Sequence, residues 1–391
     1  MDNFSFSLPE TSLLFGKGTL GQVGERAKRH GSHALLVTGK GSMKKLGFLQ
    51  KAEKSLKDAG LKVTVFEGVE PNPTADTVNR GMKLGRDKGC DVVVAIGGGS
   101  AIDAAKAMAV GIGHADEDIW PYVVREKETT NRTLPVVAIP STSGTGSHVT
   151  WYTVITNSKG EKVAYSSKFI YPKESIVDLG IVSAMPQGVT AETGFDALAH
   201  VMESYLSAGA SPVTDLLCLR AMELIAQNLP RAYADGKDMD ARYNMALADT
   251  YAGMCITPSR TIMVHAMGNV VSGIYPHISH GRALACLTGP VMRFNIEKGD
   301  EKIIARYCDV ARALGEDVED IDKETALKSV DGVLKLLRAV DIGTSMKNCG
   351  AKESDVERLT DYAIRYGAGA MGCNPVKASR KEVIQIYKES F

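Results

Sequence analysis

Residues 91–103 decide the fold of this chain, and they read DVVVAIGGGSAID. The run 91–96 is short, apolar and rich in valine, which is typical of a parallel strand that is buried on both faces. Three glycines and a serine, residues 97–100, follow it directly and open an alanine-rich helical segment. Glycines at such a point let the backbone N–H groups of a helix N-terminus approach a phosphate. The turn also fits simple tight-turn chemistry, because its spacing is not G-x-G-x-x-G.

A second polar loop, residues 141–147 (STSGTGS), also follows an apolar run. It carries five hydroxyl groups and two glycines in seven residues. In an open parallel sheet, ligands bind in the crevice outside the carboxyl ends of the strands. Two such loops in one sheet therefore favour a nucleotide-binding crevice over an isolated tight turn.

The chain has two parts, the first with short apolar runs and the second with long helical segments. The predicted strands are residues 34–38, 62–66, 91–96 and 135–139, and amphipathic segments 46–59 and 77–89 lie between them. This alternation predicts an α/β domain with a doubly wound, mostly parallel sheet. After Pro186 the sequence predicts helices at residues 190–206, 213–228, 241–254, 301–314, 323–340 and 354–366. We expect a dinucleotide-binding domain, residues 1–184, and an all-helical metal-binding and substrate domain, residues 185–391, with a ligand cleft between them.

Composition restricts the class of partner. The chain has 391 residues, of which 44% are apolar and 24% charged, and its 46 basic residues balance its 46 acidic ones. Nucleic-acid and anionic-membrane binders usually carry a basic excess, which is absent here. Met1 to Ser5 lack the basic and apolar parts of a signal peptide, and no apolar run approaches the length of a membrane span. Seven scattered cysteines without a C-x-x-C pair fit reduced thiols, so we expect a cytoplasmic protein.

Acidic and imidazole side chains cluster in the helical half. Asp196 and His200 are four residues apart in a helical segment, so they share one face. His265, His277 and His280 follow downstream. An aspartate with three imidazoles suits Fe²⁺ or Zn²⁺ rather than Ca²⁺ or Mg²⁺, and such an ion can polarise a substrate oxygen. We prefer His280 as the third imidazole, since it stands beside Gly281 in a turn that is expected to start a new apolar helix, and we assign His277 to a supporting position or a proton relay. An ordinary hydrogen-bonded pair remains the alternative for Asp196 and His200.

Several motifs occur in a fixed order along the chain: FGKG at 15–18, PNPT at 71–74, GGGSAID at 97–103, PSTSGTGS at 140–147 and GFDALAH at 194–200. Together with the histidine segment they resemble the iron-containing (group III) alcohol dehydrogenases, which include lactaldehyde reductases, butanol dehydrogenases and 1,3-propanediol dehydrogenases. The likeness covers essentially the whole chain. It implies a dehydroquinate synthase-like architecture, metal-dependent NAD(P)-linked hydride transfer between a small primary alcohol and its aldehyde, and a homodimer or larger homo-oligomer.

The resemblance carries specific roles over to this chain. The implied metal ligands are Asp196, His200, His265 and His280, holding Fe²⁺ or, alternatively, Zn²⁺. Asp196, His265 and the proton relay His277 are the expected catalytic residues. The expected cofactor-binding residues are Asn72, Gly97, Gly98, Gly99, Ser100, Asp103, Ser141, Thr142, Thr145 and Lys162.

The coenzyme preference is predicted from the end of the first strand. Many members of this family carry an acidic residue there, which repels the 2′-phosphate of NADP. This chain has Gly39 at that place, with Lys40 and Ser42 beside it. We therefore expect NADP(H) to be favoured over NAD(H). Two further departures, His148 in place of a glutamate and Asn269 in place of a histidine, have no assigned role.

The substrate is the least determined feature. Arg260 lies just ahead of the expected ligand His265, where relatives often have small or neutral residues. It could anchor an anionic group of the substrate, or it could form a surface ion pair. Trp151 and Tyr152 could line the pocket, although ordinary packing explains them equally well. Two other functions compete: a non-redox lyase of the same superfold, and a catalytically silent nucleotide- or metal-binding protein.

Overall fold

The computed structural model describes residue 4 and residues 10–391 of the chain, which fall into two compact units. The first, called the sheet unit here, comprises residues 10–142 and 146–185 of the described chain. The second, the helical unit, comprises residues 186–391 together with residues 143–145. Most of the stretch Met1 to Ser5, on which the expectation of no signal peptide rests, lies outside the described residues. No helix in the described part of the chain is long and apolar enough to cross a membrane.

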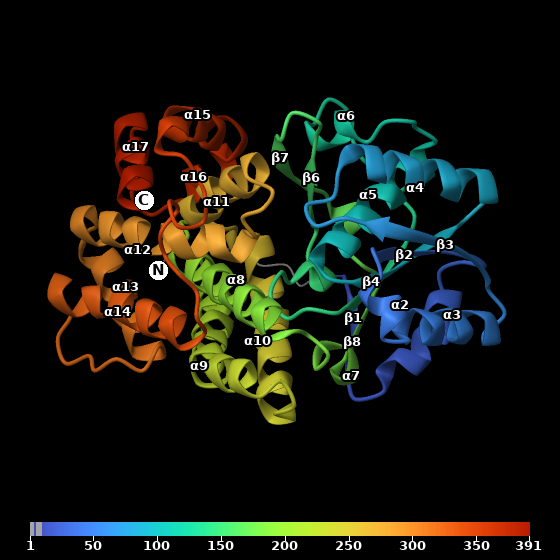
Figure 1. Ribbon diagram of the computed structural model, residues 1–391, viewed down its shortest axis with the longest axis horizontal. Coiled ribbons are helices and arrows are strands. Elements are labelled where there is room, and N and C mark those ends of the chain that lie inside the picture. The colour runs from blue at the N-terminus through green and yellow to red at the C-terminus, as the bar shows by residue number, and fades with distance from the viewer. Residues whose placement is uncertain (1–3, 5–9) are drawn as a thin grey trace. The chain divides into compact units, whose positions relative to one another are not determined.

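Six parallel strands form the sheet of the sheet unit, in the order β1-β8-β5-β4-β2-β3 (Figure 1). They are β1 (Ser12–Gly16), β2 (His33–Gly39), β3 (Lys62–Val69), β4 (Val92–Gly97), β5 (Val136–Pro140) and β8 (Glu174–Asp178). All residues of β4 and β5 are buried, as their unbroken apolar runs require. The prediction of a doubly wound parallel sheet is confirmed.

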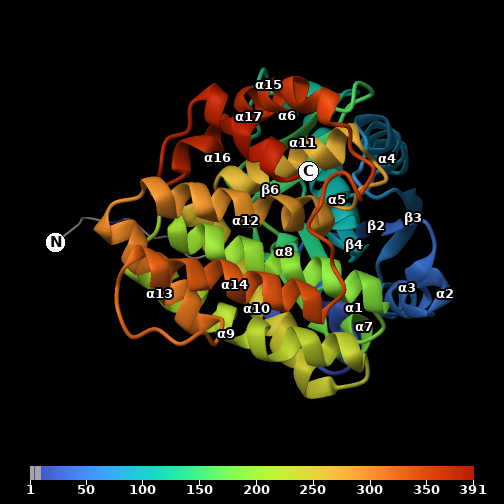
Figure 2. The ribbon, with the colours of Figure 1, turned by 60° about the vertical axis from the view of Figure 1, so that its left-hand side comes forward.

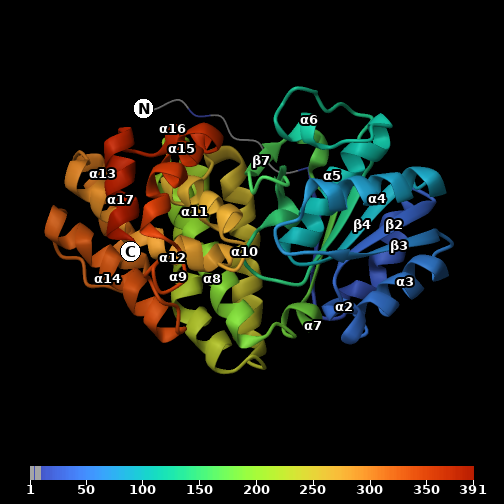
Figure 3. The same ribbon diagram turned by 45° about the horizontal axis from the view of Figure 1, so that its top comes forward.

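Helices cover both faces of this sheet. Figure 3 shows α4 (Ala75–Lys88) and α5 (Gly99–His114) on one face and α3 (Phe48–Asp58) on the other, where α1 (Val23–Lys28) packs against it. Leu49, Ala52 and Leu56 of α3 are buried in one core with the strand residues. The short helices α2 (Ser42–Lys45), α6 (Trp120–Val123) and α7 (Leu179–Val182) lie in the connections.

A β-hairpin that the sequence analysis did not predict extends the sheet unit. Its strands β6 (Tyr152–Thr156) and β7 (Lys162–Ser166) pair antiparallel in a sheet of their own. Buried and partly exposed side chains do not alternate cleanly along either strand, so the usual signal of a two-faced strand is weak. The hairpin begins five residues after the polar loop 141–147, and it therefore fixes the direction in which that loop leaves the sheet.

The helical unit contains ten helices longer than one turn in the described chain: α8 (Gln187–Leu206), α9 (Pro212–Ala234), α10 (Met239–Ser259), α11 (Met263–Ile274), α12 (His280–Lys298), α13 (Glu301–Ala313), α14 (Lys323–Ala339), α15 (Val356–Tyr366), α16 (Ala368–Cys373) and α17 (Arg380–Glu389). α8 packs against α9, α10, α12 and α13 (Figure 2). Most of its side chains are buried from Gly194 onward. The prediction of an all-helical second half is confirmed, although α11, α16 and α17 were not predicted.

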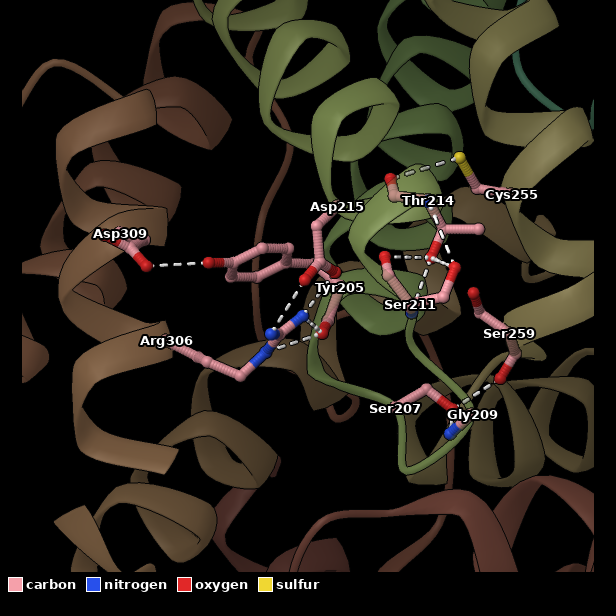
Figure 4. A network of polar contacts seen from close by, with 10 residues as sticks. All are labelled: Tyr205, Ser207, Gly209, Ser211, Thr214, Asp215, Cys255, Ser259, Arg306 and Asp309. Atoms are coloured by element: carbon pink, nitrogen blue, oxygen red, sulfur yellow. Dashed lines mark hydrogen bonds and ion pairs between the residues drawn. The ribbon is translucent and has the colours of Figure 1, made fainter. Parts of the chain in front are cut away.

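Polar contacts hold the segment between α8 and α9 in place (Figure 4). The Arg306 guanidinium of α13 donates to the Tyr205 carbonyl oxygen at 2.9 Å and to the Asp215 carboxylate at 2.6 and 3.0 Å. Ser207 Oγ donates to the carbonyl oxygen of Ser259, the last residue of α10. This contact ties the end of α8 to the end of α10, which immediately precedes Arg260.

Candidate active site

Three buried or half-buried side chains of the helical unit converge on one point. Asp196, His265 and His280 can each offer one ligand atom such that all of these atoms lie within 4.8 Å of one another. Asp196 Oδ1 lies 3.3 Å from His265 Nε2 and 3.7 Å from His280 Nε2. The His200 ring stacks on His265 with 4.3 Å between the ring centroids, and its Nδ1 lies 3.7 Å from Asp196 Oδ1. Three of the four residues expected as metal ligands thus form one cluster, and the ring of the fourth, His200, stacks beside it.

Three helices position these side chains. Asp196 and His200 lie one turn apart on α8, His265 lies in the first turn of α11, and His280 is the first residue of α12. Gly281 lets α12 start close to α8, because a Cβ on this residue would lie 2.2 Å from the Glu192 carbonyl oxygen. The close approach of two helices therefore places His280 beside Asp196.

Hydrogen bonds orient two of the imidazoles. His200 Nδ1 donates to the Gly144 carbonyl oxygen at 3.1 Å, which leaves its Nε2 as the acceptor or ligand atom. His265 Nδ1 donates to Glu203 Oε1, so its Nε2 faces Asp196. A metal-binding histidine commonly donates its other ring N–H to a carboxylate or a carbonyl in this way.

Glu203 is a residue that the sequence analysis missed. Only 2% of it is exposed, and its Oε2 accepts hydrogen bonds from the backbone N–H groups of Ile262 at 2.6 Å and His265 at 3.3 Å. The available signal was its spacing, because Asp196, His200 and Glu203 are separated by four and three residues and share one face of a helix. A buried acidic residue on the same helical face as two candidate ligands indicates a supporting partner.

The charges of the cluster suit a cation. Burial raises the pKa of Asp196, but His200, His280 and His265 outweigh it and hold that pKa well below its usual range. Burial lowers the pKa of His200 to about 4. Burial also lowers the pKa of His265, but Glu203 and Asp196 outweigh it and raise the pKa to about 9. The protonated His265 therefore neutralises the buried carboxylates, and a divalent ion with imidazole and carboxylate ligands could replace that proton.

His277 lies apart from these ligand atoms. Its side chain is exposed, and its ring lies 5.9 Å from the Tyr275 ring, centroid to centroid. Its Nε2 lies 3.0 Å from the position that a Cβ on Gly350 would take. Of the two histidines considered for the last ligand position, His280 is the one that the geometry places beside Asp196.

The glycine-rich turn lies where the strand order of the sheet reverses. The chain moves from β2 outward to β3, returns to β4 on the other side of β2, and continues to β5. β2 ends at Gly39 and β4 ends at Gly97, so these two carboxyl ends flank the switch point, with Ser42 nearby at the start of α2. Gly97 has φ 157°, and a Cβ on it would lie 2.7 Å from Ala101 Cβ. Gly98 caps the N-terminus of α5, whose first residues are Gly99 and Ser100.

Of the other expected cofactor residues, Ser141 and Thr142 adjoin the glycine turn, and the rest lie in separate segments. Ser141 N donates to the Gly97 carbonyl oxygen at 2.8 Å. The Thr142 methyl group would lie 3.3 Å from a Cβ on Gly98. Asn72, with φ 54°, lies in the turn between β3 and α4, and Lys162 opens β7 with 9% of its surface exposed. Thr145 lies in the short loop segment that groups with the helical unit.

Asp103 and Lys106 brace the hairpin instead of lining the glycine turn. The Asp103 carboxylate accepts from Ser147 Oγ at 2.6 Å and from Val154 N at 2.9 Å. Lys106 is fully buried and donates to Ser147 Oγ and to the Thr150 and Tyr152 carbonyl oxygens at 2.7 to 3.0 Å. Burial lowers the pKa of Lys106 to about 7, although Asp103 opposes this. These contacts hold the loop that adjoins the glycine turn, and the role of Asp103 at the cofactor stays a prediction.

His148 is buried beside this pair in the sheet unit. Burial and the charge of Lys106 lower its pKa to about 3, so its imidazole is neutral at physiological pH. Its position in place of a glutamate keeps no assigned role.

The residues considered for substrate contacts occupy different units. Arg260 is exposed, directly follows the last residue of α10 with φ 65°, and has its Nη1 3.5 Å from the position of a Cβ on Gly369. The Trp151 ring packs against Tyr171 and Tyr152 with centroid distances of 5.8 and 6.2 Å. Trp151 thus packs against two aromatic rings of the sheet unit, and a substrate contact of Trp151 or Tyr152 stays a prediction.

Comparison with known proteins agrees with this geometry. The profile of iron-containing alcohol dehydrogenases matches residues 10–179, and that of the C-terminal part of the Fe-containing alcohol dehydrogenase family matches residues 190–391. The 1,3-propanediol dehydrogenase of Citrobacter freundii is 36% identical over 99% of both chains. The NADPH-dependent butanol dehydrogenase of Clostridium saccharobutylicum is 35% identical over 98% of this chain and 97% of that protein.

Solved structures extend the likeness to the fold. An archaeal halo-thermophilic alcohol dehydrogenase from a Red Sea brine pool is 44% identical, with a TM-score of 0.97 over 100% of this chain and 99% of that one. A 1,3-propanediol oxidoreductase is 35% identical, with a TM-score of 0.91 over the whole of both chains. Both halves of the sequence, the parallel sheet and the helices agree, and the chain belongs to the iron-containing alcohol dehydrogenase family.

Proposed function

We propose that this chain is a metal-dependent, NAD(P)-linked dehydrogenase that interconverts a small primary alcohol and its aldehyde. The observation that carries the proposal is the convergence of Asp196, His200, His265 and His280 from three helices. Their oxygen and nitrogen donors fit Fe²⁺, with Zn²⁺ as the alternative. A divalent ion bound there would act as a Lewis acid on the substrate oxygen, which favours hydride transfer between the carbon and a nicotinamide.

The chain's own residues have separate tasks in this proposal. Glu203 holds the proton of His265 on Nδ1, and Gly144 holds that of His200 on Nδ1. The glycine turn after β4 and the α5 N-terminus bind the coenzyme phosphates. His277 stays a predicted proton relay, since its exposed ring can exchange protons with water. We also propose a cytoplasmic location, because all seven cysteines are free, and a homodimer or larger assembly.

The function is tested by removing and restoring the metal. The protein is stripped with a chelator under anaerobic conditions, reloaded with Fe²⁺ or Zn²⁺, and assayed for NADPH and NADH oxidation with short aldehydes. Activity should return only with metal. Asp196→Ala should lose bound metal and reduce kcat/KM on the order of 100-fold or more, because the ligand set is then incomplete.

The control is Asp240→Ala, which removes an exposed carboxylate on α10 and should retain both metal and activity. Circular dichroism should show that both variants fold. Coenzyme binding without turnover, whatever metal and aldehyde are supplied, would argue instead for the non-redox lyase or the silent binding protein.

Glu203→Gln tests the supporting carboxylate. The amide oxygen can still accept from the N–H groups of Ile262 and His265, but the amide nitrogen then faces His265 Nδ1. The His265 proton would move to Nε2, the ligand atom, so metal affinity should fall about 10- to 100-fold. Competition with a chromogenic chelator measures this affinity, and the exposed Glu223→Gln serves as the matched control. An unchanged metal affinity in a folded variant would remove Glu203 from the site.

We propose that NADP(H) is the preferred coenzyme, because no carboxylate stands at Gly39 and the exposed Lys40 follows it. The names of the relatives support neither coenzyme over the other, since one is an NADPH-dependent butanol dehydrogenase and another is an NAD-dependent methanol dehydrogenase. Gly39→Asp fits sterically, because its Cβ would lie an ordinary 3.5 Å from the Val69 carbonyl oxygen. It should reduce kcat/KM for NADPH about tenfold or more relative to NADH, by charge repulsion. A wild-type enzyme that prefers NADH would refute the preference.

We propose that the substrate can carry an anionic group, which Arg260 would bind. Arg260 is exposed just after the end of α10, and it forms no ion pair with another residue of the described part of the chain. Arg260→Met should raise KM for aldehydes that carry a carboxylate about tenfold, with uncharged aldehydes of equal length unaffected. A steady-state panel of such paired aldehydes measures the difference. Equal effects on both members of each pair would indicate a structural role for Arg260.

A further inference from the structure

Two thiols of the helical unit lie next to each other outside the metal cluster. Cys286 Sγ in α12 lies 4.0 Å from Cys349 Sγ in the turn before α15. Cys286 is 1% exposed, whereas Cys349 is half-buried. The chain holds another close pair, Cys218 and Cys255, but both of those residues are completely buried. Cys286 and Cys349 therefore form a neighbouring pair in which one thiol is accessible and the other is protected.

The backbone around Cys349 is suited to a small movement. Cys349 N donates to the Ser345 carbonyl oxygen at 3.1 Å, and Gly350, with φ 91°, follows it at the end of this turn. A disulfide requires the sulfur atoms to come to about 2.05 Å, so they must approach by about 2 Å. Cys286 is held in the middle of a buried helix, so the turn that carries Cys349 is the part that moves.

The surrounding charges make Cys349 the nucleophile. A hydrogen bond from Cys286 and the nearby Arg282 guanidinium lower the pKa of Cys349 to about 6, although burial and Glu192 oppose this. Arg282 lies one turn before Cys286 on α12, and its Nε donates to Glu192 Oε1 at 2.6 Å. The hydrogen bond that Cys286 gives to Cys349 raises its own pKa, so Cys286 keeps its proton until Cys349 has reacted. Thiolate at Cys349 and thiol at Cys286 are the two states that an attacking and a resolving cysteine need.

We propose that Cys286 and Cys349 form a thiol–disulfide exchange site for low-molecular-weight disulfides and close reversibly to an intrachain disulfide. Cys349 Sγ attacks one sulfur of the small disulfide, its S–S bond breaks, and the first small thiolate leaves. Cys286 then loses its proton and attacks Cys349 Sγ. The bond between Cys349 and the small molecule breaks, and the second small thiolate leaves and takes up the proton that Cys286 lost. One small disulfide is reduced to two thiols while the two protein sulfurs are oxidised to one disulfide.

This site is independent of the proposed dehydrogenase activity. The new bond would join α12 to the turn at Gly350, with α13 and α14 inside the closed loop. A loop of this length restricts the unfolded chain, so oxidation should raise the thermal midpoint of the helical unit. Neither cysteine belongs to the metal cluster, and its ligand His280 is fixed separately through the contact of Gly281 with Glu192.

The test uses the reduced full-length protein and oxidised glutathione. We expect the number of free thiols to fall from seven to five, and peptide mapping to find one link, between Cys286 and Cys349. A thiol reductant should restore all seven. Cys286→Ser should stop at the mixed disulfide and carry one glutathione on Cys349, because the resolving thiol is gone. Cys349→Ser should form no disulfide.

The matched control is Cys373→Ser, since Cys373 is half-buried like Cys349 but has no thiol partner among the described contacts. It should react as the wild type does. Glutathione spread over several cysteines without the 286–349 link would overturn the proposal.

A second measurement covers the case in which a serine variant fails to fold. Iodoacetamide should alkylate Cys349 of the wild type at least about tenfold faster than Cys373 at neutral pH, because the neighbouring thiol and Arg282 lower the pKa of Cys349. Equal rates at the two cysteines would also overturn the proposal.

Discussion

Two carboxylates buried on one face of α8, Asp196 and Glu203, are the constraint on which the helical unit depends. A buried charge costs several kcal/mol unless opposite charges and hydrogen-bond donors surround it. Glu203 meets this need with the N–H groups of Ile262 and His265, and Asp196 meets it with imidazoles. The bend between α10 and α11 and the start of α12 must therefore stay where they are. The interactions that stabilise this packing are the same ones that bring the candidate ligands Asp196, His265 and His280 together.

The sheet unit also buries a charged side chain, in this case the basic side chain of Lys106. Lys106 is fully buried, and its ammonium group is surrounded by the Ser147 hydroxyl and by backbone carbonyl oxygens that follow the polar loop. Asp103 completes this arrangement by accepting from Ser147 and Val154. The helix that opens with the glycine turn thus also anchors the loop after β5. The glycine turn after β4 and the polar loop after β5 are thus both held by one helix, α5.

The strands whose residues are mostly apolar were predicted from the sequence. A buried strand whose acidic residues accept hydrogen bonds from residues far away in the sequence was missed. β8 is completely buried, yet it begins with Glu174 and ends with Asp178. Arg26 donates to Glu174 at 2.6 Å, and Leu20 N donates to Asp178 at 2.7 Å, so both charges are satisfied inside the fold. β1 was missed because it is a half-exposed edge strand with a weak pattern. Patterns of burial along a strand cannot reveal partners that lie far away in the sequence.

The sequence by itself determined the family likeness, because its motifs occur in a characteristic order. It also determined the parallel sheet, the glycine turn after β4 and the pairing of Asp196 with His200, because each of these follows from neighbouring residues in the chain. Only the tertiary structure decided that His280 and not His277 faces Asp196, and that Glu203 supports His265. These contacts join residues 62 to 84 positions apart. Spacing along the chain cannot show which atoms converge over such separations, because the packing of α8, α11 and α12 sets their directions.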